Sequence, residues 1–336
     1  MKHCRHELVL AGAWLALAAG ISLVNPAFLS LANLFDLLKA GVVTGILALA
    51  VLIVLVSGGI DISFTAIAAF AMYASCRVLV AAGSTDGAVA GMLLATAIGA
   101  GLGMVNALFI GALRLPTLIV TLGTAGLFRG CLLAFVGTGI INNLPAGLIR
   151  LSRWQLFRQT SAGGETIGLS AAVLALAAVA VGVAVLLQRT VTGRSIHALG
   201  GSAGAAERIG IRTVRLQCFI YTVVGALAGL AGILHAITMR NANPFDLVGA
   251  ELTVIAAVVL GGADVFGGRG TVTGTLLGVF LLVTLNNSLI LLGVPTYWQR
   301  VWIGAIILIS VAVSARNRRA AASPREEAPA IGTPSQ

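Results

Sequence analysis

Hydrophobic residues gather in long runs along this chain, and short polar connections separate one run from the next. A helix that crosses a bilayer needs about 20 predominantly apolar residues. The pattern yields ten runs of suitable length, of which the eighth is the shortest. They are residues 8–24, 37–57, 62–82, 88–113, 117–136, 167–188, 214–237, 252–265, 272–292 and 301–315. We therefore expect an all-α polytopic membrane protein with about ten transmembrane helices.

The composition supports this fold class. Of the 336 residues, 58% are apolar and only 10% are charged, whereas soluble domains contain about 25% charged residues. Such a chain cannot cover the surface of a soluble domain. Residues 1–315 are predicted to form the transmembrane domain. Residues 316–336, which are rich in Ala, Pro and charge, are predicted to form a disordered cytoplasmic tail.

Basic residues are unevenly distributed between the two sides that this pattern defines. With the N-terminus inside, 13 of the 21 Lys and Arg residues fall in cytoplasmic pieces and 7 in outer pieces, and Arg129 stays within a span. Because cytoplasmic loops carry the excess of positive charge, we expect both termini in the cytoplasm and residues 142–166 as the longest external loop. The basic residues lie singly at the ends of apolar runs, which favours membrane lipid over nucleic acid as a partner.

Signatures of catalysis are absent from the sequence. The only lysines are Lys2 and Lys39, so the chain contains no G-x-x-x-x-G-K-[ST] loop that could cradle the phosphates of a nucleotide. It also lacks an H-E-x-x-H zinc motif and a G-x-S-x-G elbow. Its four cysteines are far apart and are interpreted as small apolar fillers. We predict a protein that is not an enzyme and that has no cofactor and no metal.

Two Gly-Gly pairs, each followed by an aspartate, interrupt the apolar pattern. Gly58 and Gly59 precede Asp61, and Gly261 and Gly262 precede Asp264. Adjacent glycines allow a helix to unwind, and non-helical backbone at membrane depth is tolerated where it lines a cavity. The same segments also fit cytoplasmic turns between spans. In either case Asp61 is expected to support the break, accepting hydrogen bonds from backbone N–H groups or from the Ser63 hydroxyl.

Three asparagines, Asn106, Asn286 and Asn287, are the other polar side chains of interest inside the predicted spans. They are able to bind a polyhydroxylated solute along a translocation path. Amides also hydrogen-bond transmembrane helices to one another, and this second interpretation is the one that we favour.

Small residues recur at helical spacing in two of the predicted spans. The first set is Gly99, Gly103 and Ala107, and the second is Gly225, Gly229 and Gly232. Such spacing lets helix backbones approach closely in lipid, so we expect both spans to pack tightly against neighbours.

A long polar connection, residues 190–213, carries several arginines and is predicted to be a cytoplasmic loop. Its middle, residues 203–209, favours a short helix that ends at Gly210. A short helix at the membrane surface suits docking into a groove of a partner protein. An ordinary basic cytoplasmic loop has the same composition.

Four segments, in order along the chain, resemble the motifs of one transporter family. Residues 57–63 (S-G-G-I-D-I-S) are similar to G-G-I-D-L-S, and residues 115–130 to an L-P-x-x-I-x-T-L-G run that ends in R-G. Residues 192–213 resemble T-x-x-G-R-x-x-x-A-x-G followed by A-A-R-x-x-G-I, and residues 251–278 resemble E-L-x-x-I-A-A-x-V-x-G-G and the glycines after it. With Asn286, Asn287, Trp298 and Gln299, the resemblance extends over residues 33–312. It is to the inner-membrane permeases of bacterial ATP-binding cassette (ABC) importers for ribose and related monosaccharides.

The resemblance implies the ABC importer permease architecture in a bacterial inner membrane. Such a permease pairs with a second copy or a sister permease, docks two ATPase subunits, and receives solute from a periplasmic solute-binding protein. It also implies that residues 193–211 are the coupling helix that receives the motion of the ATPase. The residues with this implied role are Gly193, Arg194, Ala206, Glu207 and Gly210. Departures from the family pattern, including Glu207 where Arg is common, leave the sugar undefined.

A secondary transporter driven by an ion gradient is the alternative from another class. Such transporters also use broken helices near a buried substrate site. This alternative accounts for the Gly-Gly-Asp segments and leaves the sequence of residues 190–213 unexplained.

Overall fold

The computed structural model describes residues 2–160 and 166–291, together with the isolated positions 293, 295, 298, 301, 304, 305 and 308. The predicted tail, residues 316–336, lies outside the described residues, as does most of the tenth predicted span. Gln299, which contributes to the resemblance, lies outside them too.

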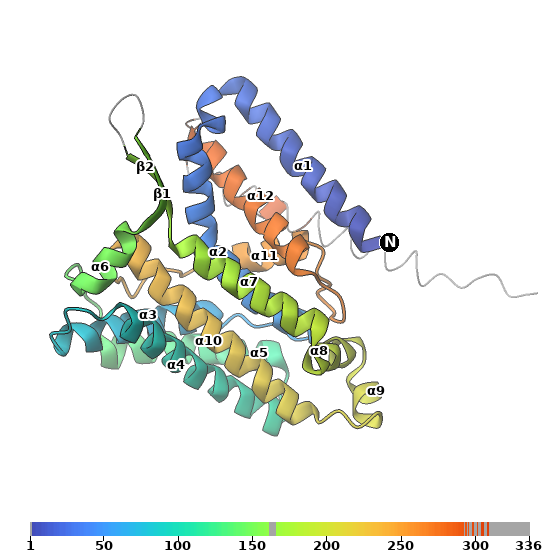
Figure 1. Ribbon diagram of the computed structural model, residues 1–336. Helices are drawn as coiled ribbons and strands as arrows, with labels where there is room; N and C mark the ends of the chain where they lie inside the picture. Colours follow the sequence, from blue (N-terminus) through green and yellow to red (C-terminus); the bar gives the residue numbers. More distant parts are fainter. Residues whose placement is uncertain are drawn as a thin grey trace, which may run out of the picture.

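The described chain is almost entirely helical, as the hydrophobic pattern predicts (Figure 1). Its helices are α1 (Lys2–Val24), α2 (Leu31–Val56), α3 (Phe64–Ala81), α4 (Ala88–Ala107), α5 (Thr117–Cys131), α6 (Ala146–Arg153), α7 (Ala172–Arg189), α8 (Val191–Gly201), α9 (Ala203–Arg208), α10 (Thr213–Met239), α11 (Ala250–Leu260) and α12 (Val272–Leu291). A 3-10 turn, η1 (Pro26–Leu29), precedes α2, and π-helical turns η2 (Leu108–Ala112) and η3 (Leu132–Val136) extend α4 and α5.

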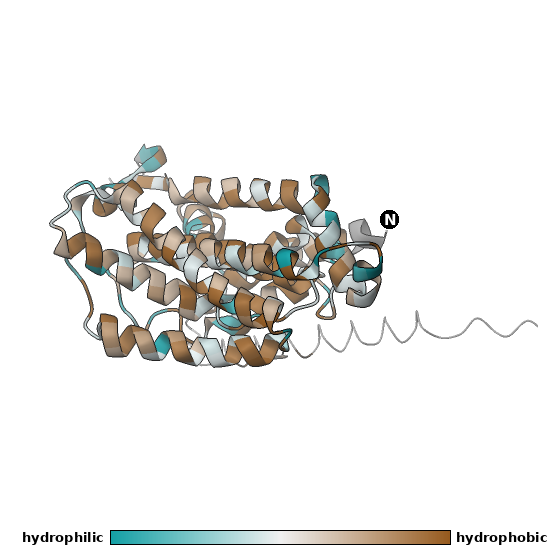
Figure 2. Cartoon of the chain, turned by 90° about the horizontal axis from the view of Figure 1, so that it is seen from below, coloured by the Kyte–Doolittle hydropathy of each residue, from teal (hydrophilic) through white to brown (hydrophobic). Residues whose placement is uncertain are grey.

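Eight helices of the described chain are long and apolar enough to cross a membrane, and they correspond to the first seven predicted spans and the ninth. The eighth predicted span forms α11, which has only eleven residues. At a rise of about 1.5 Å per residue, such a helix covers roughly half of a hydrocarbon core about 30 Å thick. Figure 2 shows hydrophobic residues along the long helices, with hydrophilic residues mostly near the two ends of the bundle.

The centre of the bundle is α2. Every residue from position 45 to position 56 of this helix is buried, because α7, α10, α11 and α12 pack around it. A helix that is apolar on all sides belongs in such an interior position. At the edge of the bundle, α1 lies along α12, where the Trp14 indole N–H donates to the Thr284 hydroxyl at 2.9 Å.

The predicted close approach of small-residue helices occurs between α4 and α10. A methyl group on Gly99 would overlap the carbonyl oxygen of Gly225, and one on Gly103 would overlap that of Tyr221. Gly232, on the same helix α10, lies equally close to the Ala68 carbonyl of α3. The two glycine patterns therefore face each other, and α4, α10 and α3 meet backbone to backbone.

One end of the bundle, here called the hairpin end, carries α6 and two strands, β1 (Gln155–Thr160) and β2 (Thr166–Ser170). The strands pair antiparallel, with Arg158 opposite Gly168 and Thr160 opposite Thr166. The stretch expected to be the longest external loop thus contains a helix and a hairpin strand. The opposite end, here called the α8 end, carries α8 and α9 (Figure 1).

The prediction for residues 190–213 is wrong in one respect, because its first half is helical as well as its middle. The expected short helix is present as α9, and α8 precedes it. The Thr190 hydroxyl caps α8 by accepting from the Gly193 N–H at 3.0 Å. Ile196 and Leu199 are buried against the bundle, and this burial stabilises the helix. Its glycines and polar residues do not predict a helix from the sequence alone.

Candidate functional site

The α7–α8 corner is tight, and Gly193 makes it possible. A methyl group on this residue would overlap the carbonyl oxygens of Leu186 and Leu187 in the last turns of α7. Arg194, the next residue, is exposed. The corner therefore fixes α8 against the end of α7 and leaves its basic side chain pointing out of the bundle.

The short helix α9 presents an exposed face beyond α8. Ala206 is buried, whereas Glu207 and Ile209 are exposed, Ile209 by 73%. The Thr213 hydroxyl donates to Glu207 Oε1 at 3.0 Å, which ties α9 to the start of α10. Gly210 ends the helix with a φ of +86°, a conformation that other L-residues rarely adopt.

The first Gly-Gly break and the connection between α11 and α12 meet α8 at a single point. Gly58 and Gly267, each with positive φ, contact the backbone of Gly200 in the last turn of α8. The Gly268 N–H donates to the Val56 carbonyl at 2.8 Å. We call Gly58, Gly200, Gly267 and Gly268 the glycine junction, because no side chain separates the three backbones there.

After the glycine junction, the first break runs as non-helical chain to the start of α3. Ile60 is held by α5, since its N–H donates to the Thr117 hydroxyl at 3.1 Å and its carbonyl accepts from the Thr121 hydroxyl at 3.2 Å. The break is thus satisfied by threonine side chains, as non-helical backbone inside a membrane bundle requires.

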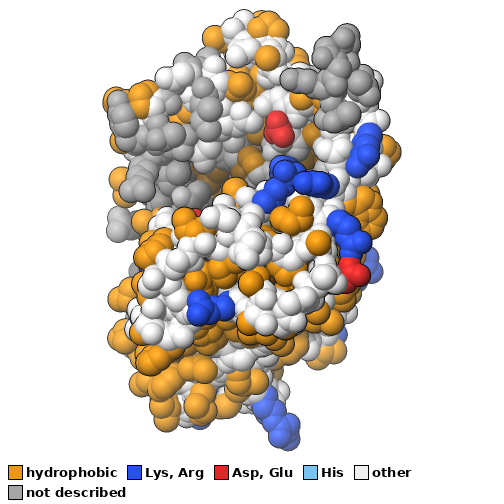
Figure 3. Space-filling view, turned by 90° about the vertical axis from the view of Figure 1, so that its left-hand side faces the viewer, with side chains coloured by type: hydrophobic (Ala, Val, Ile, Leu, Met, Phe, Trp, Pro, Cys, Tyr) orange, Lys and Arg blue, Asp and Glu red, His pale blue; other side chains and the backbone are white. Residues whose placement is uncertain are grey.

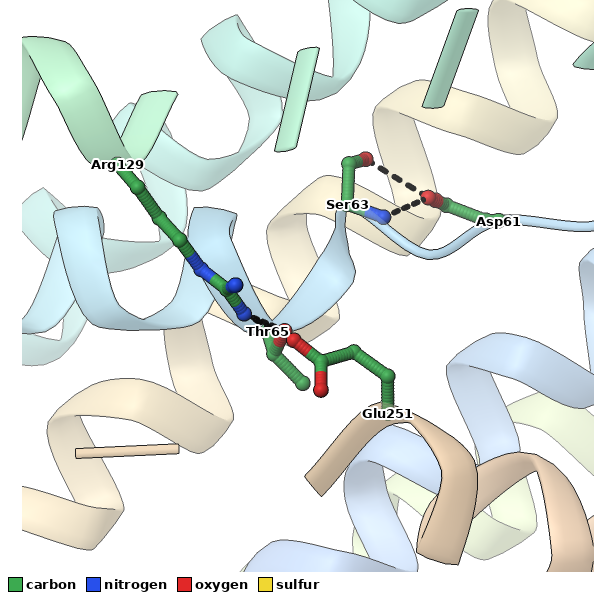
Figure 4. Close-up of polar contacts among 5 residues, drawn as sticks. All are labelled: Asp61, Ser63, Thr65, Arg129 and Glu251. Carbon is green, nitrogen blue, oxygen red and sulfur yellow. Dashed lines mark hydrogen bonds and ion pairs between the residues drawn. The ribbon is translucent and has the colours of Figure 1, made fainter. Parts of the chain in front are cut away.

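Asp61 is 2% exposed and folds back on the same segment (Figure 4). The Ser63 N–H and hydroxyl both donate to Asp61 Oδ1 at 2.7 Å. The Asn106 amide of α4 in turn donates to Ser63 Oγ at 2.7 Å. Asp61 lies outside both flanking spans, and burial raises the pKa of its carboxyl to about 6, against the lowering effect of the Ser63 hydrogen bonds.

Asp61→Ala is expected to reduce the amount of folded protein in the membrane, because it leaves two buried Ser63 donors without their acceptor. The cost is about 1–3 kcal/mol for such a loss. Asp61→Asn keeps Oδ1 and should be milder. Membrane abundance and transport per assembled complex measure the two effects separately. Full abundance of Asp61→Ala together with an altered solute preference would show instead that Asp61 contacts the cargo.

The other predicted site residues are spread over several places. Asn287 donates to Asn33 Oδ1 at 2.9 Å and so joins α12 to α2, whereas the buried Asn286 Oδ1 has no partner among the described residues. Gly261 packs on the backbone of Gly274 at the start of α12, and Gly262 has a φ of +90°. These contacts are of the kind that hold helices together.

The sequence interpretation missed a partly buried ion pair that joins three helices (Figure 4). Arg129 of α5 is paired with Glu251 of α11, and the Thr65 hydroxyl of α3 donates to Glu251 Oε1 at 2.7 Å. Arg129 also donates to Thr65 Oγ1 at 3.2 Å. Each residue is noticeable by itself in the sequence, since Arg129 is a charge within a predicted span and Glu251 is the first residue of the fourth segment that resembles the family. Nothing in the sequence pairs two residues that lie 122 positions apart.

A cavity of about 470 Å³ opens at the hairpin end. Basic side chains line it, together with Asp36, Ser152 and Gln155: they are Lys39, Arg153, Arg158 and Arg240. Figure 3 looks onto this end of the molecule and shows Lys and Arg side chains gathered across its middle. The arrangement suits an acidic surface or an anionic group.

The chain is similar over most of its length to transport permeases. Residues 33–311 match the family described as branched-chain amino acid transport system / permease component. The chain is 36% identical to the ribose import permease protein of Bacillus subtilis strain 168, over 87% of each chain. It is 33% identical to the autoinducer 2 import system permease protein of Enterobacter sp. strain 638, over 94% of this chain and 88% of the relative.

A third relative is the L-arabinose ABC transporter permease protein of Azospirillum brasilense, which is 33% identical over 89% of this chain and 84% of its own length. No solved structure matches the chain significantly. The chain belongs to this permease family. It is a permease component of an ABC importer and a multi-pass protein of the inner membrane.

Proposed function

We propose that this permease carries a monosaccharide, or a similarly small polyhydroxylated solute, and that separate ATPase subunits dock at α8 and α9 to drive it. The names of the relatives, which refer to ribose, L-arabinose and autoinducer 2, support the class of solute. The glycine junction is the observation that carries the coupling role, because it links α8 directly to the first Gly-Gly break and to the connection between α11 and α12.

The proposed coupling proceeds through backbone contact. Gly200 touches Gly58 and Gly267 with no side chain between them, so a displacement of α8 moves both connections together. One connection leads into α3 and the other joins α11 to α12. Packed interfaces shift between discrete arrangements and do not deform continuously. A small displacement of α8 therefore displaces the ends of α3, α11 and α12 that these connections hold.

The ATPase-docking face consists of the exposed residues of α8 and α9. Arg194, Glu207 and Ile209 combine both charges with an apolar side chain that is 73% exposed. Gly193 and Gly210 bound this face at the two places where the backbone turns. Charged residues of both signs around an exposed apolar anchor are suited to docking on a partner protein.

The α8 end faces the cytoplasm in this proposal, and both termini lie on that side. The excess of Lys and Arg in the connections at that end supports the orientation. The hairpin end then faces the periplasm, where its basic cavity receives an acidic surface of the solute-binding protein. A second copy or a sister permease completes the pathway, and the open side of α5 at Gly123, Gly126 and Gly130 faces that pathway.

The test of this function is uptake into proteoliposomes that contain the permease, its ATPase and its solute-binding protein. D-ribose, L-arabinose and autoinducer 2 are the probes. ATP-dependent accumulation is expected only with all the components, because this chain has no lysine in a phosphate-cradling loop. Permease alone should not accumulate solute.

An ion-gradient control separates the two transporter classes. The permease without ATPase is given a proton gradient and then a sodium gradient, with the same probes outside. Uphill uptake under either gradient would contradict the ABC mechanism and support a secondary transporter.

A further inference from the structure

The ion pair of Arg129 and Glu251 leaves much of its hydrogen-bonding capacity unused. Within the described residues, the contacts of Glu251 all converge on one oxygen, Oε1. Its second oxygen is turned away from the guanidinium (Figure 4). A guanidinium has five N–H donors, yet Arg129 uses only Nη2 within the described residues, and its buried Nε has no partner there. Among the described residues, no further partner therefore meets these adjacent donors and this acceptor.

This geometry differs from that of an ion pair built only for stability. Arginine and carboxylate groups that serve as clamps frequently form two parallel hydrogen bonds. Here the pair shares a single oxygen with Thr65 instead. Each hydroxyl of a sugar both donates and accepts, so neighbouring hydroxyls can accept from the guanidinium and donate to the free carboxylate oxygen. The unused groups match a polyhydroxylated, neutral solute.

The pair also lies far from the ends of the bundle and is accessible. Arg129 stands within the span that runs from Thr117 to Val136, away from either end. Its side chain is 32% exposed, and that of Glu251 is 10% exposed. A partly exposed charge at membrane depth is costly in lipid and is normally found facing a water-filled cavity or a partner. Arg129 is thus placed to meet a solute in transit.

We propose that Arg129 and Glu251 form the contact for the hydroxyl groups of the solute within the membrane. This inference rests on the proposed function and adds the residues that the cargo touches. Arg129 donates through the guanidinium N–H groups that Glu251 leaves free, and Glu251 accepts at Oε2.

The positions of Arg129 and Glu251 on different helices explain how the solute is released. Glu251 lies in the first turn of α11, which ends at the second Gly-Gly break, and Thr65 lies in the first turn of α3, which follows the first break. Both helices are therefore connected to the glycine junction, whereas Arg129 is on α5. A motion of α8 shifts Glu251 and Thr65 relative to Arg129 and separates the two halves of the solute contact.

The experiment compares sugars that differ by one hydroxyl in the complete reconstituted importer. The probes are D-ribose or L-arabinose, whichever the wild type accumulates, and its monodeoxy analogues. One solute-binding protein delivers all sugars to all permeases, so its preference cancels when ratios are compared between variants. We expect the wild type to favour the parent sugar over at least one analogue by about tenfold. Glu251→Gln and Arg129→Lys should each bring that ratio close to one.

The matched control is the surface ion pair of Arg150 and Asp86, which is 70% and 77% exposed. Arg150→Lys and Asp86→Asn should leave every ratio at its wild-type value. Unchanged ratios in Glu251→Gln and Arg129→Lys, with lower abundance alone, would overturn the inference and leave a structural ion pair. Absence of ATP-dependent uptake by the wild type would contradict the proposed function itself.

A second measurement does not depend on the ion-pair variants folding. Gly126 lies one helical turn from Arg129 and has open space around it, as does Gly101 on α4. In a permease without its native cysteines, Gly126→Cys should react with a charged thiol reagent, and the transported sugar should slow the reaction. The rate at which Gly101→Cys reacts should be the same with and without sugar. An unreactive Gly126→Cys would show that this side of α5 faces no aqueous path.

Discussion

Gly103→Ala is expected to remove most of the folded permease from the membrane, although it adds only one methyl group. That methyl group would overlap the carbonyl of Tyr221 and crowd the Cα of Gly225, so the backbones of α4 and α10 have to move apart. Overpacking of a well-packed core costs about 1–3 kcal/mol. We expect the upper part of that range, because the obstacle is backbone and cannot change its rotamer.

Gly101→Ala is the control for this prediction. Gly101 is in the same helix, two positions away, and a methyl group there meets nothing within 4 Å. Alanine in place of glycine inside a helix is favourable by about 0.5–1 kcal/mol, so the control should be slightly stabilised. Membrane abundance and thermal unfolding in detergent measure both effects. Equal stability of the two variants would mean that α4 and α10 do not meet at their glycines.

Gly200→Ala is expected to uncouple ATP hydrolysis from transport. A methyl group on Gly200 would overlap the Val56 carbonyl and press on the Gly268 N–H, which are joined by a hydrogen bond. The glycine junction then opens while α8 keeps its buried anchors Ile196 and Leu199. If the barrier to the transport step rises by about 1.4 kcal/mol relative to that of ATP hydrolysis, tenfold less solute is moved per ATP. The ATPase should still co-purify with the permease and hydrolyse ATP.

Gly201→Ala provides the comparison, because Gly201 follows directly and has no atom within 4 Å of an added methyl group. It should transport like the wild type. The ratio of solute accumulated to ATP hydrolysed is the quantity to measure in both variants. If Gly200→Ala keeps the wild-type ratio, the glycine junction does not transmit the motion of α8.

The membrane-spanning helices were predictable because hydrophobic length is a local property of the sequence. The second predicted span began six residues late because the start of α2 depends on Ser30, whose hydroxyl accepts from the Asn33 N–H. Close packing of α4 and of α10 against some neighbour was also predictable, since glycines three or four positions apart leave a groove that only another backbone fills.

Contacts between distant segments were not predictable in the same way. Gly58, Gly200 and Gly267 each look like an ordinary turn or helix-end glycine when they are read locally, and their common meeting point depends on the whole fold. Arg129 and Glu251 pair across two helices for the same reason. The helical nature of α8 was hidden because burial of Ile196 and Leu199, and not local propensity, holds it in shape.

The shortness of α11 has a consequence for how the protein is made. Its eleven residues cannot span the bilayer, and it carries Glu251 in its first turn. A segment that is too short to span and carries a carboxylate is not expected to insert into the membrane by itself. Arg129 and Thr65, which bind Glu251 Oε1, are synthesised earlier, whereas α12, which packs beside α11, comes later. Entry of α11 into the membrane is therefore a late event of tertiary folding, and insertion of this chain does not simply follow the order of its synthesis.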